Sequence, residues 1–153
     1  MQTAVITVST SVSRGESEDA SGPRLAELAR AAGADVVSQE IVSDDAGAIE
    51  ARLREHVAAG VAFVFTTGGT GLTPDDVTPE ATRAVIDREA PGFAETLRSQ
   101  SLKHTPLGIL TRGVSGIAGR TLIVNFPGNP KAIDQLFGCI APTLEHAAAS
   151  LRR

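Results

Sequence analysis

The sequence predicts a single α/β domain, in which a mainly parallel, doubly wound sheet carries helices on both faces. Short apolar runs rich in Val, Ile and Phe alternate with stretches whose apolar residues recur at helical spacing. Regular alternation of strand and helix favours parallel pairing with helices on either side of the sheet. A length of 153 residues is enough for one such core. We therefore expect one domain over residues 1–153.

The first unit is a strand over residues 4–8, a polar loop over residues 9–19 and a helix. Ser21 is a suitable N-cap for this helix, and Gly33 is suited to end it. Its expected buried stripe consists of Leu25, Leu28 and Ala29.

The second unit repeats this plan, with a strand over residues 36–42. Either Asp44 or Asp45 is expected to cap the next helix, and Gly60 to end it. The helix has an apolar stripe of Ile49, Leu53 and Val57.

The third unit begins with residues 61–65, a continuous apolar run typical of a strand buried on both faces. Thr78 and Pro79 are expected as N-cap and first residue of a helix that extends to about Glu89. Between strand and helix lie three glycines that allow a sharp turn and a close approach of a ligand to the main chain: Gly68, Gly69 and Gly71.

Two acids, Asp75 and Asp76, follow this glycine loop. Carboxylates at such a place can hold a divalent cation against phosphate oxygens. The loop is not a P-loop, because it lacks the Gly-Lys-Ser/Thr ending, and it lacks the third glycine of a dinucleotide fingerprint. A glycine turn without a ligand is the simpler alternative. The adjoining acids, and a similar arrangement near the C-terminus, favour a ligand site.

Two segments before the last unit have no helical pattern. Residues 99–106 are polar, and we expect them to form an exposed connection. Residues 113–119 contain three glycines between strand-like runs, which predicts a hairpin or an excursion of the chain, and with it one antiparallel strand at an edge of the sheet.

The last unit is a strand over residues 121–126 followed by Pro127-Gly128-Asn129-Pro130-Lys131. Asn129 is expected to cap a helix whose apolar stripe is Ile133, Leu136, Phe137 and Ile140. A helix N-terminus beside Lys131 is suited to bind an anion. The alternative is that Asn129 only caps the helix and Lys131 is only solvated.

Composition narrows the range of functions. A net charge of −4, with no Trp, no Tyr and five Phe, argues against binding of nucleic acid. No apolar run approaches about 18 residues and no leader precedes the first strand, so we expect a cytoplasmic protein without a membrane segment. Cys139 is expected in the core, and His56 and His146 at helix surfaces or boundaries. The histidines, with His104, lack metal-ligand spacing.

Several motifs follow one another over nearly the whole chain: Asp19-Ala20-Ser21-Gly22-Pro23, Thr66-Thr67-Gly68-Gly69-Thr70-Gly71, Asp76-Val77-Thr78-Pro79-Glu80-Ala81-Thr82, Ala90-Pro91-Gly92, Ile109-Leu110-Thr111-Arg112 and Phe126-Pro127-Gly128-Asn129-Pro130. In this order they resemble the molybdopterin adenylyltransferase family of molybdenum-cofactor biosynthesis. The family includes bacterial MogA and MoaB proteins and the pterin-adenylating domain of plant and animal fusion proteins.

This resemblance implies transfer of AMP from ATP to the phosphate of molybdopterin, with pyrophosphate as leaving group, in a Mg²⁺-dependent homotrimer. The family's two essential aspartates correspond to Asp44 and Asp76, which are expected to hold Mg²⁺ or its bound water. A plain helix cap remains the alternative for Asp44, and a turn acid for Asp76. The residues expected to bind the substrates are Ser21, Gly22, Gly68, Gly69, Thr70, Gly71, Thr111, Pro127, Gly128, Asn129 and Lys131.

The chain departs from the family's pattern at three positions. Thr10 stands where an acid is common, Asp75 where Arg is common, and Thr111 where Ser is usual. Arg112 is expected to pair with an acid or to bind an anion, and the alternative is that it is only solvated. These departures keep open a homologue that binds the pterin with little or no turnover. A third alternative, a generic nucleotide-binding domain, lacks its glycine fingerprint here.

Overall fold

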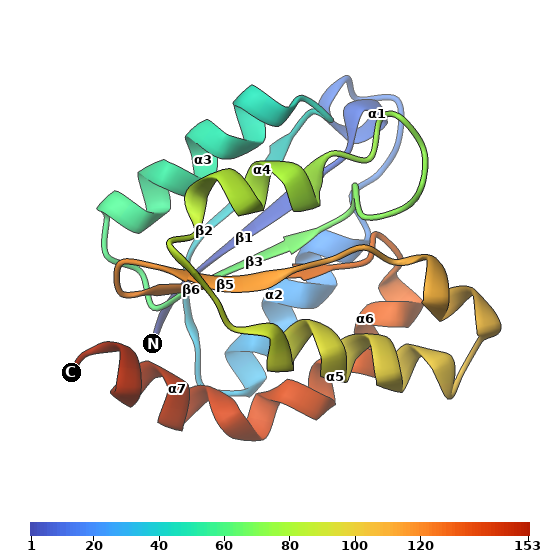
Figure 1. Cartoon of the computed structure of the whole chain (residues 1–153). Helices are drawn as coiled ribbons and strands as arrows, with labels where there is room; N and C mark the ends of the chain where they lie inside the picture. The colour runs from blue at the N-terminus through green and yellow to red at the C-terminus, as the bar shows by residue number, and fades with distance from the viewer.

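A six-stranded sheet crosses the middle of the molecule, with helices packed against both of its faces (Figure 1). The computed structural model describes all residues, Met1–Arg153. The strands are β1 (Gln2–Val8), β2 (Asp35–Val42), β3 (Phe63–Thr67), β4 (Arg88–Glu89), β5 (Ser115–Ala118) and β6 (Thr121–Phe126), in the spatial order β2-β1-β3-β6-β5-β4.

Four neighbouring strands, β2, β1, β3 and β6, are parallel, which confirms the predicted fold class. β1 pairs with β2 on one side and with β3 on the other, so the order in which successive strands join the sheet reverses at β1. In sheets of this kind, ligands bind where the carboxyl ends of the strands flank such a switch point. The loops after β1 and β3 lie at this place.

The predicted hairpin joins β5 to β6, which are antiparallel, through Gly119 at a φ of +59°. The predicted edge position of the antiparallel strand is wrong, because β4 pairs with β5 on its outer side. The helical pattern before β4 therefore ends early. α4 stops at Val85, not near Glu89, and Asp87 N donates to Ile117 O at 2.8 Å. Strand pairing overrides the local helical preference there.

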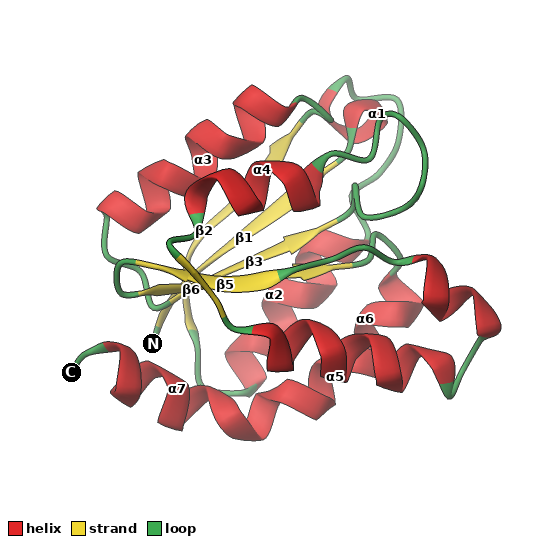
Figure 2. Cartoon of the chain, viewed as in Figure 1, coloured by secondary structure: helices red, strands yellow, loops and turns green.

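Helices α3 and α4 cover one face of the sheet, and α2, α5, α6 and α7 cover the other (Figure 2). None of the helices is both long and apolar enough to cross a membrane. The bounds are α1 Thr10–Ser13, α2 Ser21–Ala31, α3 Ala46–Ala58, α4 Thr78–Val85, α5 Pro91–Leu102, α6 Pro130–Ile140 and α7 Leu144–Leu151, with 3₁₀ turns η1 Pro106–Leu110 and η2 Ala141–Thr143.

Two apolar clusters hold these layers together, and β3 contributes to both because its side chains alternate between the faces. Phe63 and Phe65 lie in the larger cluster, and Val64 lies in the smaller one. The ring of Phe65 packs edge-on against Phe126 and Phe137. Burial of each such ring contributes about 2 kcal/mol. The core thereby fixes the carboxyl ends of β3 and β6 side by side.

Two predicted helix starts differ in detail. Ser21 does not cap α2. The carboxylate of Asp19 accepts instead from Gly22 N at 3.0 Å, and it also accepts from Thr7 Oγ1 at 2.9 Å. Thr78 is the first residue of α4, and its buried hydroxyl donates to Gly68 O at 3.0 Å. Both helix starts are thus tied to strand ends by contacts that a cap pattern does not reveal.

Three further expectations are corrected. α5 continues to Leu102, so only the second half of the polar segment 99–106 is a connection. His56 is buried and lies 2.5 Å from Glu40 Oε1, because β2 brings that carboxylate under α3. Cys139 is half-buried beside a cavity and is not part of the core.

Candidate functional site

The loops after β1, β3 and β6 meet at the carboxyl edge of the sheet. Gly68 N donates to Phe126 O at 3.1 Å. Gly68 has a φ of +103°, and a Cβ there would lie 2.3 Å from Val8 O. A Cβ on Gly128 would lie 3.0 Å from Gly68 Cα. Only glycine allows these three loops to approach so closely.

The loop after β3 has bound carbonyls and free amides. Gly69 O accepts from Thr78 N at 3.1 Å, Thr70 O accepts from Arg112 N at 2.8 Å, and Gly71 O accepts from Arg112 Nε at 2.8 Å. The N–H groups of the same three residues donate to no protein acceptor. Successive free N–H groups in a glycine turn form an anion-binding concavity.

The side chain of Arg112 is occupied within the protein. Besides Gly71 O, it donates to Asp76 O at 2.7 Å and to both carboxylate oxygens of Glu80, at 2.8 and 3.1 Å. The hydrogen bonds and charge of Arg112 hold the pKa of Glu80 below its usual value. Of the three predicted roles for Arg112, the structure shows pairing with an acid.

Asp44 and Asp45 have different tasks at the junction of β2 and α3. Asp45 caps α3 by accepting from Ala48 N at 2.8 Å. Asp44 lies before the helix, and its side chain contacts Thr10. The N and Oγ1 of Thr10 donate to Asp44 Oδ2 at 2.9 and 3.0 Å. Asp44 Oδ1 accepts from no protein donor. It lies 3.3 Å from the place of a Cβ on Gly69.

Asp76 is held in the same manner by Thr73. The N and Oγ1 of Thr73 donate to Asp76 Oδ2 at 3.0 and 2.8 Å, and Oδ1 has no protein donor. A Cβ on Gly71 would lie 2.8 Å from Asp76 Oδ2. Each carboxylate therefore adjoins the glycine loop and keeps one oxygen without a partner. The neighbouring Asp75 is exposed.

These two carboxylates are suited to a Mg²⁺ ion whose coordination is completed by a substrate. The structure contains no group of three or more His, Cys, Asp or Glu side chains close enough to hold a metal by themselves. Mg²⁺ usually keeps several waters and takes one or two carboxylates together with substrate phosphates. Asp44 and Asp76 match that smaller set, with the open amides of residues 69–71 between them.

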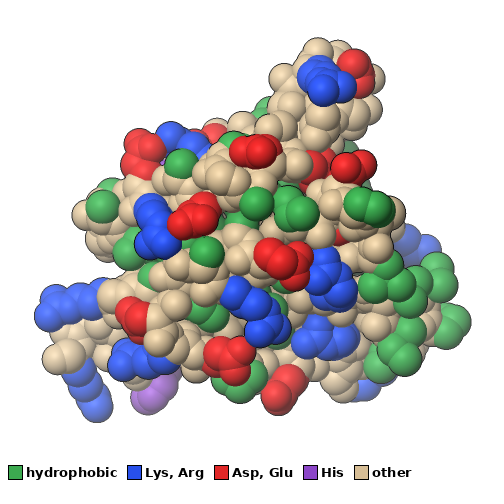
Figure 3. Space-filling view, turned by 45° about the horizontal axis from the view of Figure 1, so that its top comes forward, with side chains coloured by type: hydrophobic (Ala, Val, Ile, Leu, Met, Phe, Trp, Pro, Cys, Tyr) green, Lys and Arg blue, Asp and Glu red, His purple; other side chains and the backbone are tan.

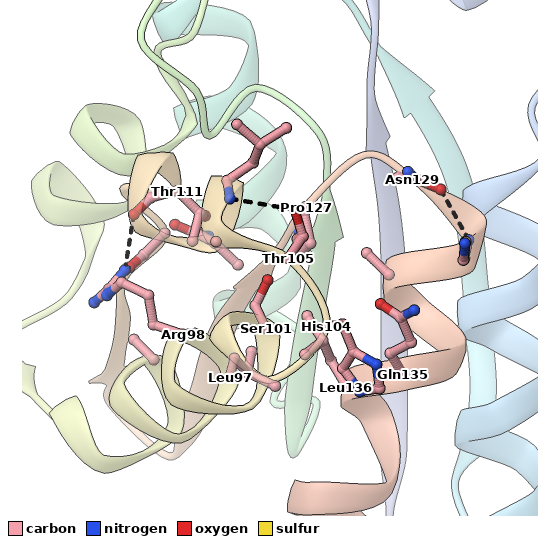
Figure 4. A pocket seen from close by; sticks show the side chains of 17 residues that line it. Leu97, Arg98, Ser101, His104, Thr105, Thr111, Pro127, Asn129, Gln135 and Leu136 are labelled. Carbon is pink, nitrogen blue, oxygen red and sulfur yellow. Dashed lines mark hydrogen bonds between the residues drawn. The ribbon is translucent and has the colours of Figure 1, made fainter.

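Two cavities lie on either side of the loop after β6. One, of about 320 Å³, is lined by residues of the β1 and β3 loops and the start of α2, among them Ser9, Asp19, Ser21, Gly68 and Gly128. The other, of about 360 Å³, lies between α5, η1 and α6 (Figure 4). It is lined in part by Arg98, Ser101, His104, Thr111, Pro127, Asn129, Lys131 and Gln135.

The start of α6 is as predicted. Asn129 caps the helix, and its Oδ1 accepts from Lys131 N at 2.9 Å. Lys131 is exposed and forms no ion pair. Its ammonium group is thus free to meet an anion at the mouth of the second cavity, in accordance with either predicted role.

The predicted site residues therefore fall into adjoining groups along one edge. Gly68, Gly128 and Ser21 line the first cavity, whereas the predicted Gly22 is buried against the side chains of Thr7 and Asp19 and does not line it. The second contains the predicted residues Thr111, Pro127, Asn129 and Lys131. Thr70 is buried between the acids, with its hydroxyl 3.4 Å from that of Thr111.

Sequence reasoning missed the residues that hold the acids. The spacing of Thr73 and Asp76 is a local turn pattern that could have been read. The contact between Thr10 and Asp44 joins residues far apart in the chain and has no local signal. Thr10, noted only as a missing acid, supplies two donors to Asp44 where an acid would have repelled it.

A family model described as "Probable molybdopterin binding domain" matches residues 4–146 of this chain. The chain belongs to this family. The predicted resemblance is thereby confirmed.

Curated relatives in the molybdopterin-binding family carry two kinds of name. A Haemophilus influenzae protein named molybdopterin adenylyltransferase is 41% identical over 138 residues, 88% of this chain and 70% of that protein. An Escherichia coli K12 protein named molybdenum cofactor biosynthesis protein B is 41% identical over 145 residues, 93% of this chain and 84% of that protein. The chain spans only 24% of a 39% identical Drosophila melanogaster protein, molybdenum cofactor synthesis protein cinnamon, in an alignment that covers 94% of this chain.

Solved structures of proteins named for molybdopterin biosynthesis have the same fold as this chain. The molybdopterin biosynthesis enzyme MoaB from Thermus thermophilus superposes with a TM-score of 0.92 at 40% identity, over 98% of this chain and 95% of that one. A molybdopterin biosynthesis protein from Mycobacterium abscessus superposes with a TM-score of 0.93 at 37% identity, over 98% and 95%.

Proposed function

We propose that this chain is a molybdopterin adenylyltransferase, which transfers AMP from ATP to the phosphate of molybdopterin and releases pyrophosphate. The observation that carries the proposal is the loop of residues 69–71, whose free N–H groups adjoin two pinned carboxylates. The curated relative with this activity in its name supports it.

The chain's own residues supply position and charge. Attack of one phosphate on another brings two anions together, so fixed donors that do not reorganise lower the barrier. Thr78 and Arg112 hold the loop carbonyls, so the amides stay directed away from the protein. Asp44 and Asp76 would hold Mg²⁺, which supplies neutralisation of phosphate charge. Thr10 and Thr73 fix the rotamers of these acids.

Two substrates need two binding regions, and two cavities adjoin the loop after β6. Their volumes, about 320 and 360 Å³, lie at the lower end of the range for small-molecule sites. α6 begins at this edge, and helix starts favour anionic groups. α2 begins there too, but the carboxylate of Asp19 already accepts from its Gly22 N. The exposed Lys131 adds a cation to the second cavity.

The second candidate is a homologue that binds the pterin with little or no adenylyl transfer. The departures Thr10, Asp75 and Thr111 favour it, because they change the charge and shape near the acids.

Incubation of the protein with molybdopterin, ATP and Mg²⁺, followed by mass spectrometry, separates the two candidates. Adenylylated pterin and pyrophosphate in equal amounts are expected. Pterin binding without that product would select the second candidate. The D44N variant, which keeps the shape of the side chain, serves as the matched control for contaminating activity.

Three finer features remain predictions: the need for Mg²⁺, the homotrimer and the cytoplasmic location. The homotrimer has a physical basis in a patch of exposed aliphatic side chains at one end of the molecule (Figure 3). The patch comprises Leu102, Leu107, Ile109 and Leu110. Sedimentation of the protein would give the mass of the assembly.

A further inference from the structure

Every N–H group of the Arg112 guanidinium has an acceptor nearby except one. Nε donates to Gly71 O, Nη1 to Glu80, and Nη2 to both Asp76 O and Glu80. Gly71 O and Asp76 O are the carbonyls at the two ends of the segment that contains Thr73. Arg112 therefore links the two ends of this segment to each other.

A second arginine holds the backbone on either side of Arg112. Arg98, on α5, donates from Nη1 to Thr111 O and to Gly113 O, both at 3.1 Å. The bond to Thr111 is drawn in Figure 4. Arg112 N in turn donates to Thr70 O. These hydrogen bonds connect α5 to the glycine loop through the side chains of Arg98 and Arg112 and the backbone of residues 111–113.

This arrangement needs arginine at position 112. The three acceptors of Arg112 lie in different directions, and a planar fork with five donors can reach all of them while a single ammonium group cannot. Arg98 donates to its two carbonyls from the two N–H groups of one nitrogen, Nη1.

We propose that Arg112 and Arg98 are positioning residues for nucleotide phosphates. They fix the carbonyls of residues 70 and 71 and of Asp76, so the opposing amides are preorganised for the phosphate chain without direct contact between Arg112 and the triphosphate. Arg98 also lines the second cavity. This inference rests on the proposed function, because the ligand it names is the triphosphate of ATP.

The expected consequence is selective for one substrate. Replacement of Arg112 by Lys or Ala should weaken ATP binding about tenfold or more, as expected for loss of several charge-assisted hydrogen bonds. The KM for ATP should rise in step, and the KM for molybdopterin should stay within about twofold, since the loop after β6 is untouched. R98A should show the same pattern to a smaller extent.

The experiment measures ATP binding by calorimetry, both KM values and thermal melting for the parent, R112K, R112A and R98A. The matched control is R83A, which removes an equal charge from α4, where Arg83 pairs only with Glu89 at 3.6 Å. Free guanidinium at millimolar concentration should restore part of the ATP affinity of R112A and leave R83A unchanged. R112K covers the case in which R112A does not fold.

ATP binding equal to the parent's in R112K, or an equal loss of ATP and molybdopterin binding in R112K, would overturn the proposal. So would an unchanged R98A. A parent that binds ATP without making adenylylated pterin would overturn the proposed function only. The calorimetric comparison would still test the positioning role of Arg112 and Arg98. A parent that does not bind ATP would overturn both.

Discussion

The loop after β3 and the loop after β6 both lead from a buried strand into a helix, yet they are held differently. The β6 loop has one side-chain contact from a distant residue, Thr67 Oγ1 to Pro127 O at 2.7 Å, and the helix that follows it is capped locally, because Asn129 Oδ1 accepts from Lys131 N. The β3 loop is held from a distance. Its carbonyls are bound by Thr78 and by Arg112, which lies 41 residues from Gly71.

The difference teaches where preorganisation comes from in this molecule. The local cap leaves the flexible side chain of Lys131 exposed. The hydrogen bonds from Thr78 and Arg112 to the β3 loop leave the amides of residues 69–71 open at fixed positions. A rigid array of donors stabilises developing charge better than a mobile cation does. We therefore expect the β3 loop to govern turnover and the β6 loop to tune affinity.

The largest effect should come from the acids beside the β3 loop. Asn at position 44 or 76 keeps the size of the side chain but removes the charge that a hard cation requires, so adenylylation should fall by about two orders of magnitude or more. Melting should hardly change, because an oxygen remains for Thr10 or Thr73. A lowered melting temperature with near-normal turnover would show that the acids are structural only.

The next effect should come from the loop itself. Gly69 has a φ of +68°, and a Cβ would lie 2.3 Å from Thr78 Oγ1, so G69V should abolish ATP binding. Gly60 has a similar φ of +75° with open space around it, which makes G60V the matched control for backbone strain. Calorimetry with ATP and melting curves distinguish the two. Retention of ATP binding in G69V would reduce the loop to a turn.

A smaller effect is expected in the β6 loop. The double variant N129A/K131Q should lose about 1 kcal/mol of stability with the cap. Its anion affinity should fall several-fold with a flatter dependence on salt, because one exposed charge is lost. Titration with pyrophosphate at two ionic strengths measures this slope. A loss as large as that of G69V would contradict the contrast between the loops.

The smallest effect concerns acid pH. Arg112 lowers the pKa of Glu80 below its ordinary value of 4.5. The ion pair therefore contributes stability above that value, and the contribution is lost as pH falls through the lower pKa of the folded protein. Melting of the parent should decline more steeply than that of E80Q between about pH 5 and about pH 3. Parallel curves would show that the pair is solvated and adds nothing.

Sequence alone determined the features that depend on neighbouring residues. The strands β1, β3 and β6, the apolar stripes of α2, α3 and α6, and the Asn129 cap all follow from local periodicity and capping chemistry. The family followed from motifs, and the fold followed from the alternation of strand and helix.

Only the tertiary structure decided which partners those residues meet. The pairing of β4 with β5 ended α4 early, and β2 buried His56 against Glu40. Thr10 was brought to Asp44, and Arg112 to the glycine loop. These contacts join segments that are distant in the chain, and no period or cap in either segment encodes the other. The contacts of Asp44 and of the glycine loop form because the sheet places the carboxyl ends of its parallel strands at one edge.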